Sequence, residues 1–303
     1  MNFQKLSFLA LMLTAISAQA LGADKSPGQY FERMSIDGVE RSYLLKVPRS
    51  CDGSKPLPMV IVLHGWTSNA KTAESGFRMD AACEREGFVL VAPNGLGSPQ
   101  GWNAGFIDLS GKRADEVKFI DQLIDHVEAE VKIDPDRIFI AGHSNGAFLA
   151  HLLGARLSQR IAAFAAVAGT IGIPQKDGAI KTIPETLGPV SAILVHGKQD
   201  RMVSYTPNAP ALLHGVSAAD SARWWAKRDG CASTPQKIVT GNGNVVTDIY
   251  SNGKAGTEVR LVTIANGKHD WPGGISLSGP EIETGVNATR LILEFFLEHP
   301  KRH

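Results

Sequence analysis

The stretch AGHSNGAF, residues 141–148, decides the fold of this chain. It holds a Gly-x-Ser-x-Gly frame in which Gly142 and Gly146 flank Ser144. A five-residue pattern of this kind also arises by chance, and a serine in a glycine-rich surface turn is the plain alternative. The residues around the frame therefore determine whether Ser144 is a nucleophile.

The frame lies between a strand and a helix. Residues 137–144 form an apolar run typical of a parallel strand buried on both faces, and residues 145–157 continue directly as a helix. A serine in such a turn is strained, and small neighbours let strand and helix approach each other. This is the setting of the nucleophile elbow in α/β-hydrolases, so we interpret Ser144 as a nucleophile.

The rest of the chain alternates strands and helices. Strands are expected at 41–48, 58–65, 88–95, 137–144, 161–169, 190–200 and 258–270, and helices at 77–87, 115–131, 145–157 and 285–299. This order predicts an α/β-hydrolase fold with a mostly parallel central sheet and helices on both faces. Residues 21–30 are polar and are expected to be loose. Without repeats or a linker, residues 21–303 are predicted to form a single catalytic domain.

A serine hydroxyl needs a base, and in this fold an acid and then a histidine follow the nucleophile along the chain. Asp200 comes just past one late strand, and His269 lies in a Gly- and Pro-rich loop after the last strand. We predict that Ser144 attacks, that His269 is the general base and then acid, and that Asp200 orients and stabilises the imidazole. The other candidates, expected to be structural or on loops, are His143, His151, His196, His214 and Asp270.

Two backbone N–H groups are predicted to form an oxyanion hole. One belongs to Asn145, the residue after the nucleophile, and the other to Trp66, in the loop that follows His64 and Gly65. His64 itself is expected to support this loop through hydrogen bonds rather than to take part in the chemistry.

Bulk composition excludes several function classes. Lys and Arg (31) nearly balance Asp and Glu (30), so nothing indicates a nucleic acid or an anionic membrane surface as a partner. The three cysteines are not at metal-ligand spacing, so no metal site is expected. Their odd number leaves at least one thiol unpaired within the chain.

The first twenty residues have the layout of a secretory signal. Lys5 precedes an apolar run, Leu6 to Ala18, and the small residues Ala18 and Ala20 frame a cleavage position after Ala20. The run is too short to span a bilayer comfortably, and no lipid or membrane anchor is expected. The predicted location is therefore secreted or periplasmic.

Several blocks together resemble a known family. LHGWTSNA, FVLVAPNG, DEVKFIDQLID, DPDRIFIAGHSNGA and KHDWPGG are similar to the polyhydroxybutyrate depolymerase and feruloyl esterase group of secreted α/β-hydrolases, relatives of carbohydrate esterase family 1. The resemblance covers roughly residues 30 to 299. It implies a serine esterase that uses the triad above, acts on a small or oligomeric ester and has no metal or organic cofactor.

The chain departs from that family in two places. Lys268 stands before the catalytic histidine, where family members often have glycine. Relatives also tend to carry a cysteine near residues 250–256, the usual partner for the position of Cys231, whereas this chain has Asn252 there. A Cys51–Cys83 pair is an alternative that the sequence leaves open.

The acyl pocket and the substrate are less constrained. Trp102, in the Gly-rich loop 97–106, and Trp271, beside His269, are predicted to line an aromatic pocket together with Trp66, with loop packing as the alternative. Feruloyl, acetyl or short hydroxyalkanoate esters are the expected substrates. The chain ends soon after its last helix, so efficient attack on crystalline polymer is not expected.

An acyltransferase, a thioesterase, a peptidase or a non-catalytic binding protein on the same fold is the alternative. The oligomeric state is not predicted.

Overall fold

The computed structural model describes residues 25–175, 177, 179–275 and 284–302. Its strands are β1 (Gly28–Ile36), β2 (Val39–Val47), β3 (Leu57–Leu63), β4 (Val89–Pro93), β5 (Ile133–His143), β6 (Ala163–Val167), β7 (Gly172–Pro174), β8 (Ile180–Thr182), β9 (Ser191–Gly197), β10 (Gln236–Thr240), β11 (Val245–Tyr250) and β12 (Val259–Ile264). Its α-helices are α1 (Met79–Glu86), α2 (Glu116–Glu128), α3 (Asn145–Arg156), α4 (Ala218–Asp229) and α5 (Ala288–Glu298).

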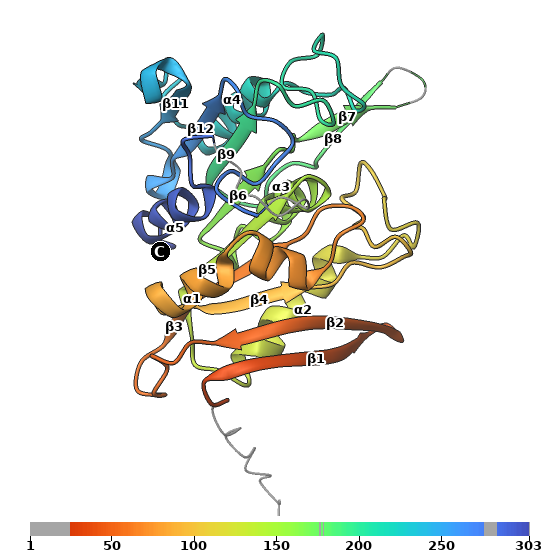
Figure 1. Cartoon of the computed structure of the whole chain (residues 1–303), viewed down its shortest axis with the longest axis vertical. Coiled ribbons are helices and arrows are strands. Elements are labelled where there is room, and N and C mark those ends of the chain that lie inside the picture. The colour runs from red at the N-terminus through yellow and green to blue at the C-terminus, as the bar shows by residue number, and fades with distance from the viewer. Residues whose placement is uncertain (1–24, 176, 178, 276–283, 303) are drawn as a thin grey trace, which may run out of the picture.

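Ten strands form one mixed sheet in the order β1-β2-β4-β3-β5-β6-β9-β12-β11-β10 (Figure 1). The six central strands, from β4 to β12, are parallel, and the two strands at each edge are antiparallel. Parallel strands end at the same edge of a sheet. The loops that follow β3, β5, β9 and β12 therefore lie next to one another.

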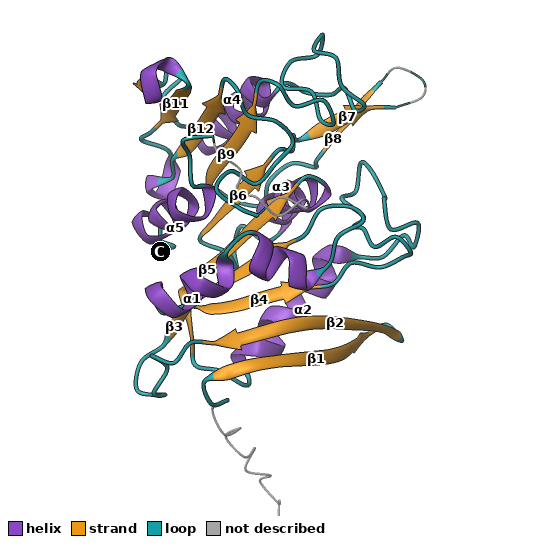
Figure 2. Cartoon of the chain, in the orientation of Figure 1, coloured by secondary structure: helices purple, strands orange, loops and turns teal. Residues whose placement is uncertain are grey.

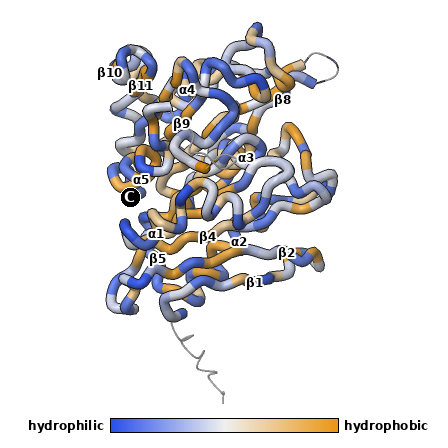
Figure 3. Tube along the Cα trace, viewed as in Figure 1, coloured by the Kyte–Doolittle hydropathy of each residue, from blue (hydrophilic) through white to orange (hydrophobic). Residues whose placement is uncertain are grey.

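Helices cover both faces of the sheet (Figure 2). The apolar sides of α1 and α5 pack against one face, and those of α2, α3 and α4 pack against the other. Since each central strand is buried on both faces, its sequence is a continuous apolar run rather than an alternating one. The hydrophobic residues follow these central strands in Figure 3. The predicted fold class is confirmed.

The sequence missed the edge elements. Residues 28–30 are not loose, because they begin β1 and pair with residues 45–47 of β2. Every residue of β10 is exposed, so the strand has no buried face and no apolar pattern to reveal it. Helix α4 was missed although it carries ordinary end signals: Ser217 accepts from the Asp220 N–H at one end, and Gly230 is left-handed at the other.

All three cysteines are free thiols, so the Cys51–Cys83 pair does not form. Cys83 is buried, and its thiol donates to the carbonyl of Phe88. The predicted signal peptide, residues 1–20, lies outside the described residues, and the limits of the catalytic domain stay a prediction. Within the ranges given above, no helix has the length and apolar character to cross a bilayer.

Candidate active site

Ser144 lies in a strained turn between β5 and α3. Its backbone has φ +54° and ψ −117°, a left-handed conformation that L-residues rarely adopt. A Cβ on Gly142 would lie 2.1 Å from the carbonyl oxygen of Gly146, and one on Gly146 would lie 2.4 Å from that of Leu63. Glycine is therefore required at both positions of the frame, for the steric reason that the pattern predicted.

Ser144, His269 and Asp200 form one hydrogen-bonded chain. His269 Nε2 is 2.8 Å from Ser144 Oγ, and His269 Nδ1 is 2.8 Å from Asp200 Oδ2. The three residues follow β5, β12 and β9 and are 69 and 125 positions apart along the chain. The structure thus brings together the three residues predicted as a triad, in the order that a nucleophile, a base and an orienting acid require.

Asp200 is held as a carboxylate. Its Oδ1 accepts from the backbone N–H groups of Met202 (2.8 Å) and Val203 (2.9 Å). Burial alone raises the pKa of Asp200, but hydrogen bonds from His196 and His269 outweigh it and hold the pKa well below its usual range. Asp200 is therefore ionised at neutral pH and stabilises positive charge on His269.

His196, expected from the sequence to be structural, contacts Asp200. It is 2% exposed, and its Nε2 lies 3.0 Å from the Val203 carbonyl oxygen and 3.3 Å from Asp200 Oδ2. It therefore contacts the same carboxylate oxygen of Asp200 that His269 contacts. Its position in the sequence could have indicated this contact, because His196 lies four residues before Asp200, near the end of β9, the strand that Asp200 follows.

The predicted oxyanion donors lie at the turn. Asn145 is the first residue of α3, where a backbone N–H has no partner within the helix. A Cβ on Gly65 would lie 3.4 Å from Ser144 Cβ, so the following residue, Trp66, begins beside the nucleophile. Among the described residues, the Trp66 N–H makes no backbone hydrogen bond and remains available as a donor.

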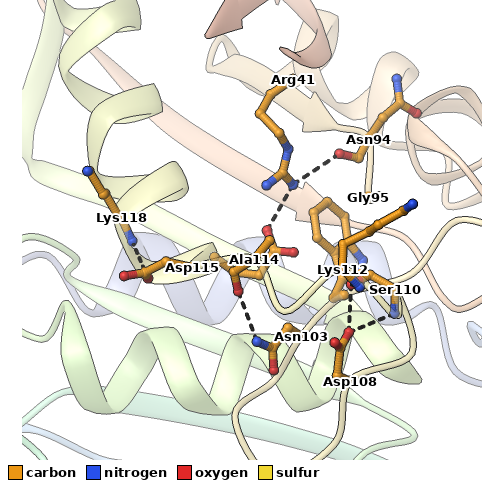
Figure 4. A network of polar contacts seen from close by, with 12 residues as sticks. Arg41, Asn94, Gly95, Asn103, Asp108, Ser110, Lys112, Ala114, Asp115 and Lys118 are labelled. Atoms are coloured by element: carbon orange, nitrogen blue, oxygen red, sulfur yellow. Dashed lines mark hydrogen bonds and ion pairs between the residues drawn. The ribbon is translucent and has the colours of Figure 1, made fainter. Parts of the chain in front are cut away.

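A buried network fixes both donor loops. Asn145 Oδ1 accepts from the Trp102 N–H (2.7 Å), and the Trp102 indole donates to the His64 carbonyl oxygen (2.8 Å). A fully buried ion pair, Arg41 Nη2 to Glu116 Oε2 at 2.8 Å, lies nearby, with the Arg41 guanidinium 5.9 Å from the Trp102 ring centroid. In the loop that carries Trp102, the Asn103 amide donates to the Ala114 carbonyl oxygen (Figure 4). The two predicted donors thus lie on segments that these contacts hold in place.

Trp102 and Trp271 are wrong as pocket residues. Trp102 is fully buried, as the contacts above require. Trp271 is 2% exposed, stacks on Phe77 at 4.2 Å and donates its indole N–H to Thr289 Oγ1. Both indoles have their polar group satisfied inside the protein, so packing is their role. Trp66, which is 45% exposed, is the tryptophan beside the nucleophile that a substrate can touch.

His64 supports the loop, as predicted. Its Nδ1–H donates to the Gly65 carbonyl oxygen (2.7 Å), and its Nε2 accepts from the Gly95 N–H (2.9 Å). This arrangement requires the neutral ring, since the second nitrogen must accept. Burial lowers the pKa of His64 to about 4, against a weaker opposing effect of the Gly65 hydrogen bond.

That lowered pKa predicts acid sensitivity. Below the unfolded value of about 6.5 the unfolded chain takes up a proton that folded His64 does not. We expect His64 to reduce the free energy of unfolding by up to about 1.4 kcal/mol per pH unit as pH falls from about 6.5 to about 4. Chemical denaturation of wild type and His64→Gln across this range measures it. Equal pH slopes for the two proteins would contradict the prediction.

The remaining histidines are not part of the triad. His143 lies beside it, with its ring centroid 5.1 Å from that of His269, and burial lowers its pKa to about 3. His151 is buried and accepts from the Trp225 indole, while His214 contacts the Pro207 carbonyl oxygen. Within the described part of the chain, no cluster of three or more metal-ligating side chains occurs.

The chain is similar in sequence to esterases. It is 30% identical over 236 residues to feruloyl esterase B of Piromyces equi, a match that covers 76% of this chain and 42% of that protein. It is 24% identical over 278 residues to a probable feruloyl esterase C of Aspergillus niger, covering 89% and 91% of the two chains. The chain thus spans about two fifths of the length of the first relative.

A solved structure shares the fold. Acetyl xylan esterase from Aspergillus awamori superposes with a TM-score of 0.59 at 14% identity, over 80% of this chain and 95% of its own. At that identity the likeness shows the fold alone. Residues 41–184, which include the elbow and the loop of Trp66, match the model of the family described as esterase PHB depolymerase. This part of the chain is therefore similar to the esterase PHB depolymerase family.

Proposed function

We propose that this protein is an exported serine esterase that hydrolyses carboxylic esters through an acyl-enzyme on Ser144. The observation that carries the proposal is the continuous chain from Ser144 Oγ through His269 to the buried carboxylate of Asp200. A strained elbow supports the proposal, and the predicted N–H donors of Trp66 and Asn145 supply the remaining part that acyl transfer needs.

The reaction follows from these positions. His269 Nε2 takes the proton of Ser144 Oγ as the oxygen attacks the ester carbonyl, and Asp200 stabilises the resulting imidazolium. The N–H groups of Trp66 and Asn145 donate to the oxyanion of the tetrahedral intermediate. His269 then gives its proton to the leaving alkoxide as the C–O bond breaks. Water repeats the cycle on the acyl-enzyme, releasing the acid and restoring Ser144.

The proposed substrates are feruloyl, acetyl or short hydroxyalkanoate esters. The feruloyl esterases similar to this chain support the first. A bifunctional acetylxylan esterase/xylanase of Neocallimastix patriciarum, 28% identical over 148 residues, supports the second, and the family description supports the third. Because Trp102 and Trp271 are buried, aromatic contact with an acyl group falls to Trp66. This weakens the case for a dedicated aromatic pocket and favours small acyl groups.

A hydrolysis panel at neutral pH tests the function. We expect purified protein to cleave 4-nitrophenyl acetate and butyrate faster than the octanoate, with methyl ferulate as the probe of the aromatic acyl group. A serine-directed phosphonate should add once per chain, at Ser144. A folded protein that is inactive on all four esters and takes up no phosphonate would overturn the esterase proposal and favour a binding protein.

The molecule that accepts the acyl group distinguishes an acyltransferase from a hydrolase. If acyl release from Ser144 depends on an added alcohol, amine or thiol rather than on water, the same triad serves an acyltransferase. Export is proposed from the signal-like residues 1–20. An exported protein that begins at Leu21 in amino-terminal sequencing supports it, and retention of Met1 opposes it.

A further inference from the structure

A basic cavity adjoins the triad on the side of His269. Its volume is about 730 Å³, and its walls come from two loops, residues 198–202 after β9 and residues 268–270 after β12, with Ala209 and Pro210 closing one side. Asp200 and His269 both line it. The cavity is therefore continuous with the acid and base of the proposed reaction.

Three cations line this cavity against one available carboxylate. Lys198, Arg201 and Lys268 are exposed and, among the described residues, make no ion pair. The opposing carboxylates are Asp270 and Asp200, but Asp200 is already occupied by two histidines and two N–H groups. The wall beside the base therefore has an excess of positive charge.

The backbone under these cations is fixed. The Lys198 N–H donates to the Ile264 carbonyl oxygen, and the Gln199 N–H donates to that of Gly267, so the two loops are joined directly. The Leu212 N–H donates to the Arg201 carbonyl oxygen, which ties the backbone of Arg201 to the segment that follows Ala209 and Pro210. The positive charges thus project from held positions rather than from a free loop.

The role of His269 in the proposed reaction indicates which part of a substrate lies in this cavity. His269 must protonate the departing alkoxide, so the alcohol half of the ester extends past the imidazole, while the carbonyl oxygen turns to the N–H groups of Trp66 and Asn145. Ser144 does not line the cavity. The reacting carbonyl therefore lies outside it, and only the alcohol half reaches in.

We propose that the basic cavity selects esters whose alcohol half carries a carboxylate, such as an ester of a hydroxy acid. This inference rests on the proposed function, and it names the substrate class of the same site. The anion would be attracted by Lys198, Arg201 and Lys268, and repelled by Asp270. The unusual Lys268, next to the base, supplies one of these charges.

A charge-matched substrate pair tests the inference. The anionic probe is 6-acetoxyhexanoate, and the neutral one is 6-acetoxyhexanamide, which has the same reach and leaving oxygen. We expect wild type to prefer the anion by about 10-fold in kcat/KM, since each charge contributes modestly in a hydrated cavity. The combined variant Lys198→Gln, Arg201→Gln, Lys268→Gln should bring the ratio near one, while Asp270→Asn should raise it by about 2-fold.

Controls separate this inference from the esterase proposal. Lys227→Gln, on α4 and outside the cavity, should keep the wild-type ratio. Salt should erase the preference, because the Debye length falls from about 30 Å at 0.01 M to about 3 Å at 1 M. Equal rates for both probes in wild type, or an unchanged ratio in the combined variant, would overturn the inference and leave the esterase intact.

A binding measurement covers the case of an inactive protein. Ser144→Ala is expected to bind the product 6-hydroxyhexanoate by calorimetry, and 6-hydroxyhexanamide about 10-fold less tightly. If this difference in affinity disappears in the variant that lacks all three cations, the result supports anion binding in the cavity. This conclusion does not depend on catalytic activity. Equal affinity for the two alcohols would reject it, whatever the activity of wild type.

Discussion

Ser144→Ala is expected to lower kcat for 4-nitrophenyl acetate by about 10⁴- to 10⁶-fold and to leave the fold unchanged. The hydroxyl oxygen is the only non-hydrogen atom removed, and without it no acyl-enzyme can form. The elbow keeps its shape because alanine adopts the left-handed conformation at a cost close to that of serine. The remaining rate is expected to come from the N–H donors and from binding alone.

The measurement is steady-state kinetics with circular dichroism on the same preparations. Ser158→Ala is a control outside the triad, because this serine follows α3 and its buried hydroxyl has no hydrogen-bond partner among the described residues. The control should keep the wild-type kcat. A Ser144→Ala variant that is folded and within about 10-fold of wild type would show that another group performs the attack.

Asp200→Asn is expected to lower kcat by about 10³- to 10⁴-fold at neutral pH. The amide oxygen can still accept from the Met202 and Val203 N–H groups. The amide nitrogen, however, would face the ring nitrogens of His269 and His196, which now donate. His269 would then turn to the wrong tautomer, and its Nε2 would no longer accept the proton of Ser144.

The depressed pKa of Asp200 is expected to make the folded protein less stable as pH falls. Its ionised form contributes stability above the unfolded pKa of about 3.9, and that contribution is lost as pH falls toward the folded value. Denaturation at a series of acidic pH values should therefore show a shallower decline for Asp200→Asn than for wild type.

Asp229→Asn is the matched control for Asp200. Asp229 is also fully buried, but burial raises its pKa to about 7, since its hydrogen bond with Val190 offsets burial only in part. The amide there resembles a protonated acid, so kcat should change little. Equal losses of kcat in the two variants would point to general damage rather than to loss of the orienting carboxylate.

The sequence alone was enough to predict the centre of the molecule. Continuous apolar runs identified the central strands, because a strand buried on both faces has no polar side to interrupt it. The order of Ser144, Asp200 and His269 along the chain predicted the three residues that the structure brings together. Local pattern suffices here because parallel strands end at one edge of the sheet.

Only the tertiary structure decided which aromatics are exposed and which charges meet. The sequence does not distinguish Trp66 from Trp102 and Trp271. In the structure, residues that are remote along the chain bury Trp102 and Trp271, whereas Trp66 remains accessible. The contact of His196 with Asp200 and the gathering of cations beside His269 depend on how separate loops pack. Such contacts arise from distances between segments, which periodicity along a single chain does not encode.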